Sequence, residues 1–123
     1  MGTWGSGNFD NDTAADYLSD VIGRLVTEVA EWTAGDPVAI EPDEYGGVVV
    51  PCNVELLHLF ARSGYGAGNL PQPQVVEEWK NVYMAVWEST IDGLEPAPGH
   101  KEERRAVLNR TFDQLAEAVG VVG

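Results

Sequence analysis

Glu55 and His58 come closest, in residue type and spacing, to an arrangement that could do chemistry. They stand three positions apart, so on a helix both side chains lie on one face. Di-iron helical bundles use this E-x-x-H spacing, but their sites also need a second such motif and two further inward carboxylates. The other histidine, His100, is expected in a loop. Because the set is incomplete, we predict a hydrogen-bonded structural histidine, no metal and no cofactor, with a polar pocket at Glu55 and His58 as the alternative.

Carboxylate pairs on the first predicted helix could bind a hard cation, and these pairs are Asp16/Asp20 and Glu28/Glu31. Calcium sites, however, draw most of their ligands from a loop, and the acidic stretch that begins at Asp10 lacks the frame of an EF-hand. We therefore predict no metal site on this helix.

Nucleophilic and phosphate-binding chemistry have no complete motif in this chain. Cys52 lies six positions from His58, which does not make them neighbours on a helix, and no G-x-S-x-G elbow occurs. We predict that Cys52 is a small buried thiol. The glycine-rich stretch 63–73, S-G-Y-G-A-G-N-L-P-Q-P, places its glycines around Tyr65 and Ala67 but lacks the Lys and the following Ser or Thr of a P-loop. A helix end followed by a turn explains these glycines better.

Charge is the one unusual feature of the composition. Asp and Glu total 20 against 7 Lys and Arg, which gives a formal net charge of −13 and a pI near 4.2. Such a field repels nucleic acid and anionic membranes and favours a basic protein partner. The acidity is either a heavily solvated surface or a face that contacts such a partner. Two clusters could form that face: Glu41, Asp43 and Glu44 in the first loop, and Glu77 and Glu78 on the third helix.

The 123 residues suit one domain with one core, residues 1–123. Hydrophobic residues make up 44% of the chain, which is ordinary for a globular protein. No apolar run is long enough to cross a membrane, and no basic region followed by an apolar core suggests a signal peptide. We therefore expect a cytoplasmic protein without membrane contact, as a monomer or a homodimer. The single Cys52 excludes an intramolecular disulfide.

Four segments have the apolar spacing of amphipathic helices. The first follows several candidate N-caps at residues 10–13 and runs to about Trp32. Residues 35–47 are expected to be a surface loop, and the three valines before Pro51 could form a short strand but have no partner strand. The other helices are predicted at about residues 51–62, 74–91 and 101–119.

The apolar faces of these helices predict how they pack. The helix at 51–62 is apolar around most of its circumference, so we expect it in the middle of a bundle. Trp79 and Trp87 share the inward face of the next helix. On the last helix Val107 or Leu108 faces inward, and the arginines are expected to form solvated ion pairs with neighbouring glutamates. The predicted fold class is all-α: a compact four-helix bundle with an ordered Gly/Trp N-terminal arm and long loops.

The first eighteen residues, M-G-T-W-G-S-G-N-F-D-N-D-T-A-A-D-Y-L, combine glycines with two aromatic anchors, so we expect them to be tied to the core. They resemble the opening of a family of short bacterial proteins, the domain of unknown function 4259 family, whose members begin M-G-x-W-G-x-G-x-F-x-N-D-x-A-x-D. The resemblance implies a mostly helical bacterial domain without known catalytic residues. The matching residues form a structural motif: Met1, Gly2, Trp4, Gly5, Gly7, Phe9, Asn11, Asp12, Ala14 and Asp16.

Because no catalytic set is complete, we expect non-enzymatic binding of another protein, of the inhibitor or immunity type, through an acidic face. The alternative is an enzyme that acts on a small molecule or depends on a metal, with a pocket near Glu55 and His58. A third hypothesis is a nucleic-acid mimic that occupies a basic groove. None of these functions requires direct binding of nucleic acid.

Overall fold

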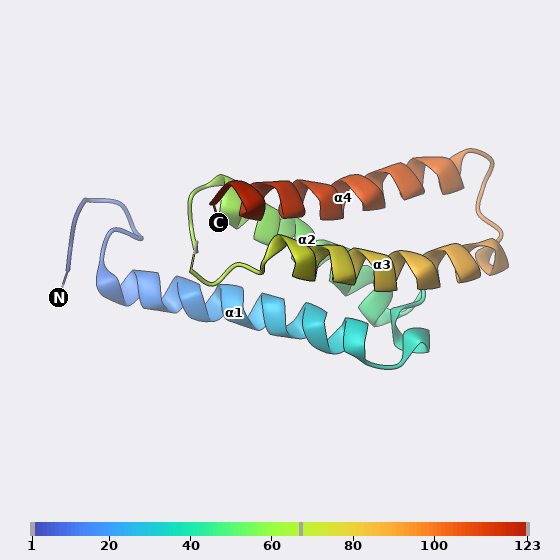
Figure 1. The fold of residues 1–123 in the computed structure, drawn as a ribbon, viewed down its shortest axis with the longest axis horizontal. Coiled ribbons are helices and arrows are strands. Elements are labelled where there is room, and N and C mark those ends of the chain that lie inside the picture. Colours follow the sequence, from blue (N-terminus) through green and yellow to red (C-terminus); the bar gives the residue numbers. More distant parts are fainter. Residues whose placement is uncertain (1, 67, 123) are drawn as a thin grey trace.

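The computed structural model describes residues 2–66 and 68–122, without the side chains of residues 121 and 122. Met1 of the N-terminal motif and Ala67 of the glycine-rich stretch lie outside the described residues. The predicted all-α bundle is confirmed over the described ranges (Figure 1). Its helices are α1 (Asp12–Ala34), α2 (Tyr45–Arg62), α3 (Pro73–Thr90) and α4 (His100–Val122), with two short 3₁₀ segments, η1 (Pro37–Ile40) and η2 (Ile91–Leu94).

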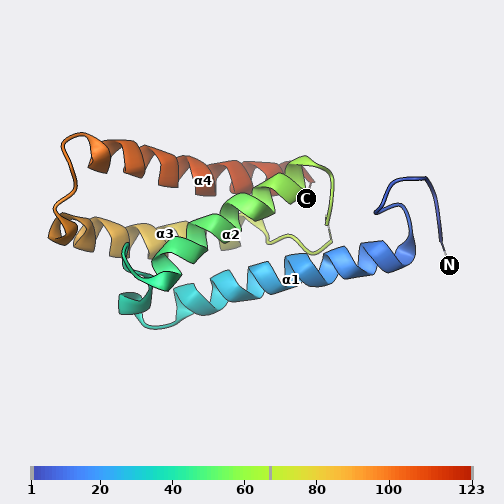
Figure 2. The same cartoon turned by 180° about the vertical axis from the view of Figure 1, so that it is seen from behind.

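Helix α2 lies across the other three helices and has the most extensive contacts with α4 and α1. Helices α1, α3 and α4 extend along the long axis of the molecule, and α2 passes behind them in Figure 1 and in front of them in Figure 2. Helix α2 packs against both α1 and α4, and α3 packs against α4. None of the helices in the described ranges combines the length and the apolar content that crossing a membrane requires.

Helix α1 begins where its capping residues predict. The side chain of Asn11 accepts a hydrogen bond from the backbone N–H of Ala14 at 2.8 Å, which satisfies one of the free donors of the first turn. Asp12 places negative charge in that turn, where the helix dipole favours it. The inward face of the helix buries Leu18, Ile22 and Val29.

The core lies where the apolar faces of α3 and α4 meet α2. Tyr83 of α3 and Phe112 of α4 are both fully buried, with ring centroids 5.7 Å apart. Trp79 and Trp87 are buried as predicted. On α4 the inward residue is Leu108, since Val107 is partly exposed.

Helix α2 begins at Tyr45, well before the predicted start at Pro51, so the expected loop at 35–47 ends early and the three valines are helical. Gly46 and Gly47 are both buried in its first turn. A Cβ atom at Gly47 would collide with the backbone carbonyl group of Glu41, and one at Gly46 with the Ala39 carbonyl oxygen and the Trp32 ring. The two glycines therefore let this turn pack directly against the backbone after η1, although glycine in sequence normally signals a helix break.

Two basic side chains of α4, Lys101 and Arg105, form ion pairs with residues outside their own helix. Arg105 donates to both carboxylate oxygens of Glu88 on α3, at 2.7 and 2.9 Å, and its guanidinium lies 5.5 Å from the centre of the Trp87 ring. This hydrogen bonding lowers the pKa of the Glu88 carboxyl. Lys101 pairs with Asp92 of η2 through a single contact, at 2.8 Å. The predicted pairs with neighbouring glutamates on α4 are therefore wrong for Arg105.

Cys52 is exposed, which overturns the prediction of a buried thiol. Because α2 starts early, Cys52 lies in mid-helix and not at a helix N-terminus. Leu56 and Leu59 are exposed on the same helix, at 43% and 39%. Helix α2 is therefore not buried on all sides, as its composition suggested.

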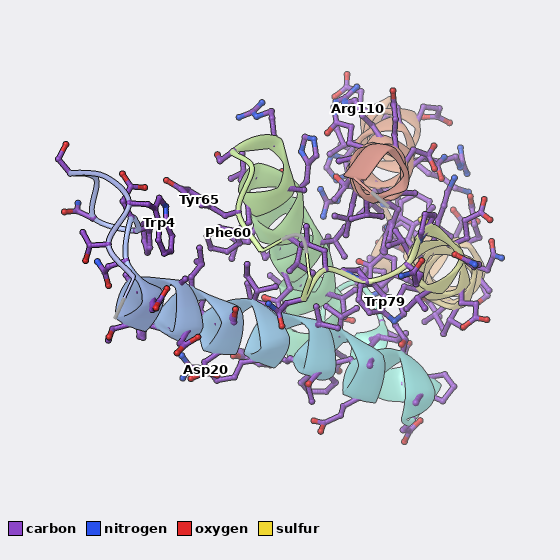
Figure 3. The ribbon with its side chains drawn as sticks, turned by 60° about the vertical axis from the view of Figure 1, so that its left-hand side comes forward. Trp4, Asp20, Phe60, Tyr65, Trp79 and Arg110 are labelled. Atoms are coloured by element: carbon purple, nitrogen blue, oxygen red, sulfur yellow. The ribbon has the colours of Figure 1, made fainter. Side chains whose placement is uncertain are left out.

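The N-terminal arm is closed by its own hydrogen bonds. The backbone N–H of Trp4 donates to the Asp10 carbonyl at 2.9 Å, and the N–H of Asp12 donates to the Gly2 carbonyl at 2.9 Å. The Gly2 N–H in turn donates to the Asp12 side chain. Trp4 nevertheless remains 61% exposed, so the expected anchoring of the arm by this residue is wrong (Figure 3).

The residue that ties the arm to the body of the protein is Phe9. It is half-buried against the core, and its ring lies 5.1 Å from that of Tyr65, which follows α2. Gly64, with φ +82°, ends α2, and the Tyr65 N–H donates back to the Phe60 carbonyl. These bonds make the glycine-rich stretch a helix end and turn, as its sequence indicates.

Candidate functional site

A buried hydrogen bond connects α3 to α2 one turn before Pro51, and we call this contact the joint between the two helices. Pro51 lies inside α2 and has no N–H, so it cannot donate to the carbonyl of Gly47 one turn earlier. The Tyr83 hydroxyl donates to that carbonyl at 2.6 Å, in a buried position. Burial raises the pKa of Tyr83 to about 12, with the charge of Arg104 acting in the opposite direction. The hydroxyl therefore stays protonated and remains a donor.

A small cavity lies beside this joint, between α2, α3 and α4. Its volume is about 170 Å³, and Cys52, Glu55 and Arg104 bring a thiol, a carboxylate and a guanidinium to its wall. Arg104 and Glu55 do not form an ion pair with each other. The cavity is smaller than the roughly 300–1,000 Å³ typical of sites for small molecules.

The predicted polar pocket at Glu55 and His58 is only half present here. Glu55 lines the small cavity, whereas His58 is half-buried on another side of α2 and does not line it. No hydrogen bond joins the two residues, both of which are described. Cys52 therefore has a carboxylate near it but no imidazole that could act as its base.

The candidate cation pairs stay isolated in the fold. Asp16 and Asp20 are exposed on α1, and Asp20 points away from the bundle (Figure 3). No group of three or more His, Cys, Asp or Glu side chains is placed to hold a metal ion within residues 2–66 and 68–122. Neither pair therefore has the further ligands that a hard cation requires.

The residues of the N-terminal motif have a local structural role. Asp10 accepts from the Gly7 N–H at 2.9 Å, and its carboxylate lies where a Cβ on Gly5 or Gly7 would be. Asn11 caps α1, and Asp12 binds the Gly2 N–H. The motif therefore closes the arm on the start of α1, without assembling reactive groups.

An acidic surface lies at the other end of α1. Trp32 of α1 and Tyr45 of α2 pack with ring centroids 6.0 Å apart, tilted by 56°. Beside them is a hollow of about 390 Å³, formed by the last turns of α1 and by η1. Its lining residues are Glu28, Glu31, Trp32, Gly35, Asp36 and Ala39. We call this the Trp32 hollow.

The two predicted acidic clusters lie on different elements. Asp43 and Glu44 are exposed and Glu41 is half-buried, all in the turn that leads from η1 into α2. This first cluster is adjacent in sequence to Tyr45, whose ring packs against Trp32. Glu77 and Glu78 are exposed in the first turns of α3, within one helical turn of Lys80.

The role of Trp32 and Tyr45 did not follow from their spacing. The sequence places Trp32 as the last apolar residue of the first predicted helix, and Tyr45 in the loop expected at residues 35–47. The sequence does carry one signal: residues 25–57 contain no Lys, Arg or His. The fold brings acidic side chains of this segment to one end of the molecule.

The comparison with protein families gave one match. The model of a family described as Domain of unknown function (DUF4259) matches residues 2–51, which include the N-terminal motif from Gly2 onward, α1 and the first turns of α2. Neither the comparison with curated proteins nor that with solved structures gave a match.

Proposed function

We propose that this chain, which belongs to the DUF4259 family through residues 2–51, is a non-enzymatic protein-binding module of the inhibitor or immunity type. Its partner presents a Lys or Arg side chain to the Trp32 hollow. The observation that carries this proposal is the pair of aromatic rings beside a hollow with carboxylates on its rim.

The hollow has the chemistry that a basic side chain needs. A cation that lies over the face of a Trp ring is attracted by the ring, with a free energy of about 0.5–1 kcal/mol at exposed sites and more when water is excluded. Glu28, Glu31 and Asp36 supply carboxylates that can accept its N–H donors. The indole N–H of Trp32 already faces Glu28 Oε1, at 3.5 Å, so that carboxylate lies beside the ring.

The surrounding charge favours the same ligand. Residues 25–57 contain no basic side chain, and Asp43 and Glu44 add exposed carboxylates next to Tyr45. A concentrated negative surface raises the association rate with a basic protein, especially at low salt. We therefore assign the contact face to the Trp32 hollow and the first-loop cluster, in preference to Glu77 and Glu78.

The experiment compares capture of proteins from a lysate of the encoding organism at low and physiological salt. The immobilised bait is the full chain, either unchanged or with one acidic group neutralised: Glu28→Gln/Glu31→Gln/Asp36→Asn at the hollow, Glu41→Gln/Asp43→Asn/Glu44→Gln in the first loop, or Glu77→Gln/Glu78→Gln on α3 as the control. We expect the hollow variant and the first-loop variant to capture less protein than the unchanged chain, and the α3 control to capture as much.

A fifth bait separates recognition by the ring from general charge attraction. Trp32→Leu keeps every carboxylate and removes the ring, so it should weaken binding of the captured protein by about two- to fivefold. Thermal melts check that each bait is folded. If the retained proteins respond to neither salt nor these substitutions, the acidity serves only solvation and the proposal is wrong.

A further inference from the structure

Helix α2 has an outward face that is apolar along its whole length. Tyr45 is 70% exposed, Val48 53%, Leu56 43% and Leu59 39%, and Cys52 is exposed between them. We call these five residues the α2 stripe. In Figure 2 no other helix passes over α2 on the side toward the viewer.

The spacing makes this face continuous. At about 100° per residue, the stripe occupies an arc of about 80° that is centred on Cys52. The buried residues of α2, among them Val50, Val54 and Leu57, lie on the opposite side of the helix. The steps of three and four residues from Tyr45 to Leu59 match those of a helix that packs against another helix.

We propose that the α2 stripe binds the same stripe of a second copy of this chain, with the two helices antiparallel. A two-fold axis next to Cys52 brings Tyr45 opposite the second copy's Leu59 and Val48 opposite the second copy's Leu56. Each aromatic or branched side chain then meets an apolar one, and a symmetric contact of this kind closes as a dimer.

The charges at the ends of α2 select this orientation. Arg62, at the last turn, and Glu44, before the first turn, are 18 residues apart, which is five full turns, so both lie on the same flank of the stripe. In the antiparallel pair Arg62 therefore lies beside Glu44 of the second copy, at both ends. A parallel pair would instead place each charge at the same end as its own kind. Arg62 forms no ion pair within the residues that the structure describes.

Glu55 sets a limit on the strength of the pair. It lies on the flank that carries Arg62, three residues from Cys52, so the two copies bring their Glu55 carboxylates to about 9 Å along the helix axes. This distance is close to the screening length of about 8 Å at physiological salt, so part of the repulsion between the two carboxylates remains. A helix pair is also a small contact beside the roughly 800 Å² that each partner buries in a standard interface. We expect a concentration-dependent dimer with a Kd of about 1–100 µM.

The Trp32 hollow stays open in this dimer, because no residue of α2 lines it. Tyr45 and Glu44 nevertheless belong both to the dimer contact and to the proposed partner face. The two proposals are tested apart, because Leu56→Glu changes only the α2 stripe and Glu28→Gln/Glu31→Gln/Asp36→Asn changes only the hollow.

Sedimentation of the full chain over about 1 µM to 1 mM measures the dimer. Leu56→Glu puts a charge into the contact and should raise the Kd at least about tenfold. Val82→Glu is the matched control, because Val82 on α3 is exposed to nearly the same extent, 40% against 43%. Glu55→Gln removes the repulsion and should lower the Kd.

Two further measurements test the orientation. Arg62→Glu should weaken the dimer, and the exchange Arg62→Glu/Glu44→Arg should restore it to within about threefold, because the pair reforms with its signs reversed. A short bismaleimide should join the two copies through Cys52, and Leu56→Glu should suppress this product. A chain that stays monomeric at 1 mM, or for which Leu56→Glu and Val82→Glu behave alike, would overturn the proposal.

Discussion

Trp4 and Trp32 show how far a side chain's type determines its role at the residue scale. Both are large apolar residues that could anchor a core. Trp4 is 61% exposed at the tip of an arm that hydrogen bonds to itself, whereas Trp32 packs between α1 and the first turn of α2. What differs is how closely other segments pack: Gly46 leaves room for the Trp32 ring, whereas Trp4 lies at the wall of an open hollow that it shares with Gly64 and Tyr65.

The arm provides a prediction at this scale. Trp4→Ala should change the free energy of unfolding by no more than about 0.5 kcal/mol, because the indole is mostly in water already. Phe9→Ala should cost about 1–3 kcal/mol, since it removes a half-buried ring from its contact with Tyr65. Urea unfolding of the two variants beside the unchanged chain measures both values. A Trp4→Ala variant as unstable as Phe9→Ala would show that the indole is buried in solution.

Among the elements, the joint between α2 and α3 replaces a hydrogen bond that is missing inside α2 with one from α3. Pro51 removes one helical hydrogen bond, and Tyr83 of another helix supplies the missing donor to Gly47. A buried carbonyl without a partner would destabilise the fold, so the two residues act as a pair. The same joint holds α2 in place, with its apolar stripe outward and the small cavity beside it.

A double-mutant cycle tests this joint. Tyr83→Phe should cost about 1–3 kcal/mol, because the Gly47 carbonyl is left buried without a donor. In a Pro51→Ala background the same change should cost less, since the introduced alanine restores the N–H that can donate to Gly47 within the helix. Equal costs in the two backgrounds, measured by chemical unfolding, would contradict the assignment.

At the scale of the whole molecule, the excess of negative charge opposes the compact state. With a net charge of −13, the many negative side chains repel one another. The ion pairs Lys80–Asp113, Lys101–Asp92 and Arg105–Glu88 are exposed, so each contributes little to the free energy of unfolding. The acidic surface at the Trp32 hollow adds to this repulsion. A basic partner at that surface would remove part of it on binding.

The stability of the whole chain should therefore rise with salt. Going from about 10 mM to 150 mM NaCl shortens the screening length from about 30 to 8 Å, so long-range repulsion falls before the close ion pairs are much weakened. We expect the melting temperature to increase by a few degrees, followed by circular dichroism at low protein concentration. A melting temperature that falls with salt would mean that the three ion pairs outweigh the repulsion.

The fold class, the place of α1 and most of the core could be predicted from the sequence, which also limited the N-cap of α1 to residues 10–13; the structure shows that Asn11 is the cap. These follow from periodicity and capping chemistry, which act between residues close in the chain. The family match to residues 2–51 agrees with the resemblance of the first eighteen residues.

Contacts in the folded chain were needed to show where α2 begins, that Cys52 and Trp4 are exposed, and that Trp32 and Tyr45 meet beside a hollow whose lining includes three carboxylates. Each of these depends on a contact between distant segments: the first turn of α2 against the backbone after η1, Tyr83 against Gly47, and Phe9 against Tyr65. Local propensity treats Gly46, Gly47 and Pro51 as helix breakers. In the folded chain the glycines permit close packing, and a tyrosine from another helix supplies the hydrogen bond that the proline cannot make.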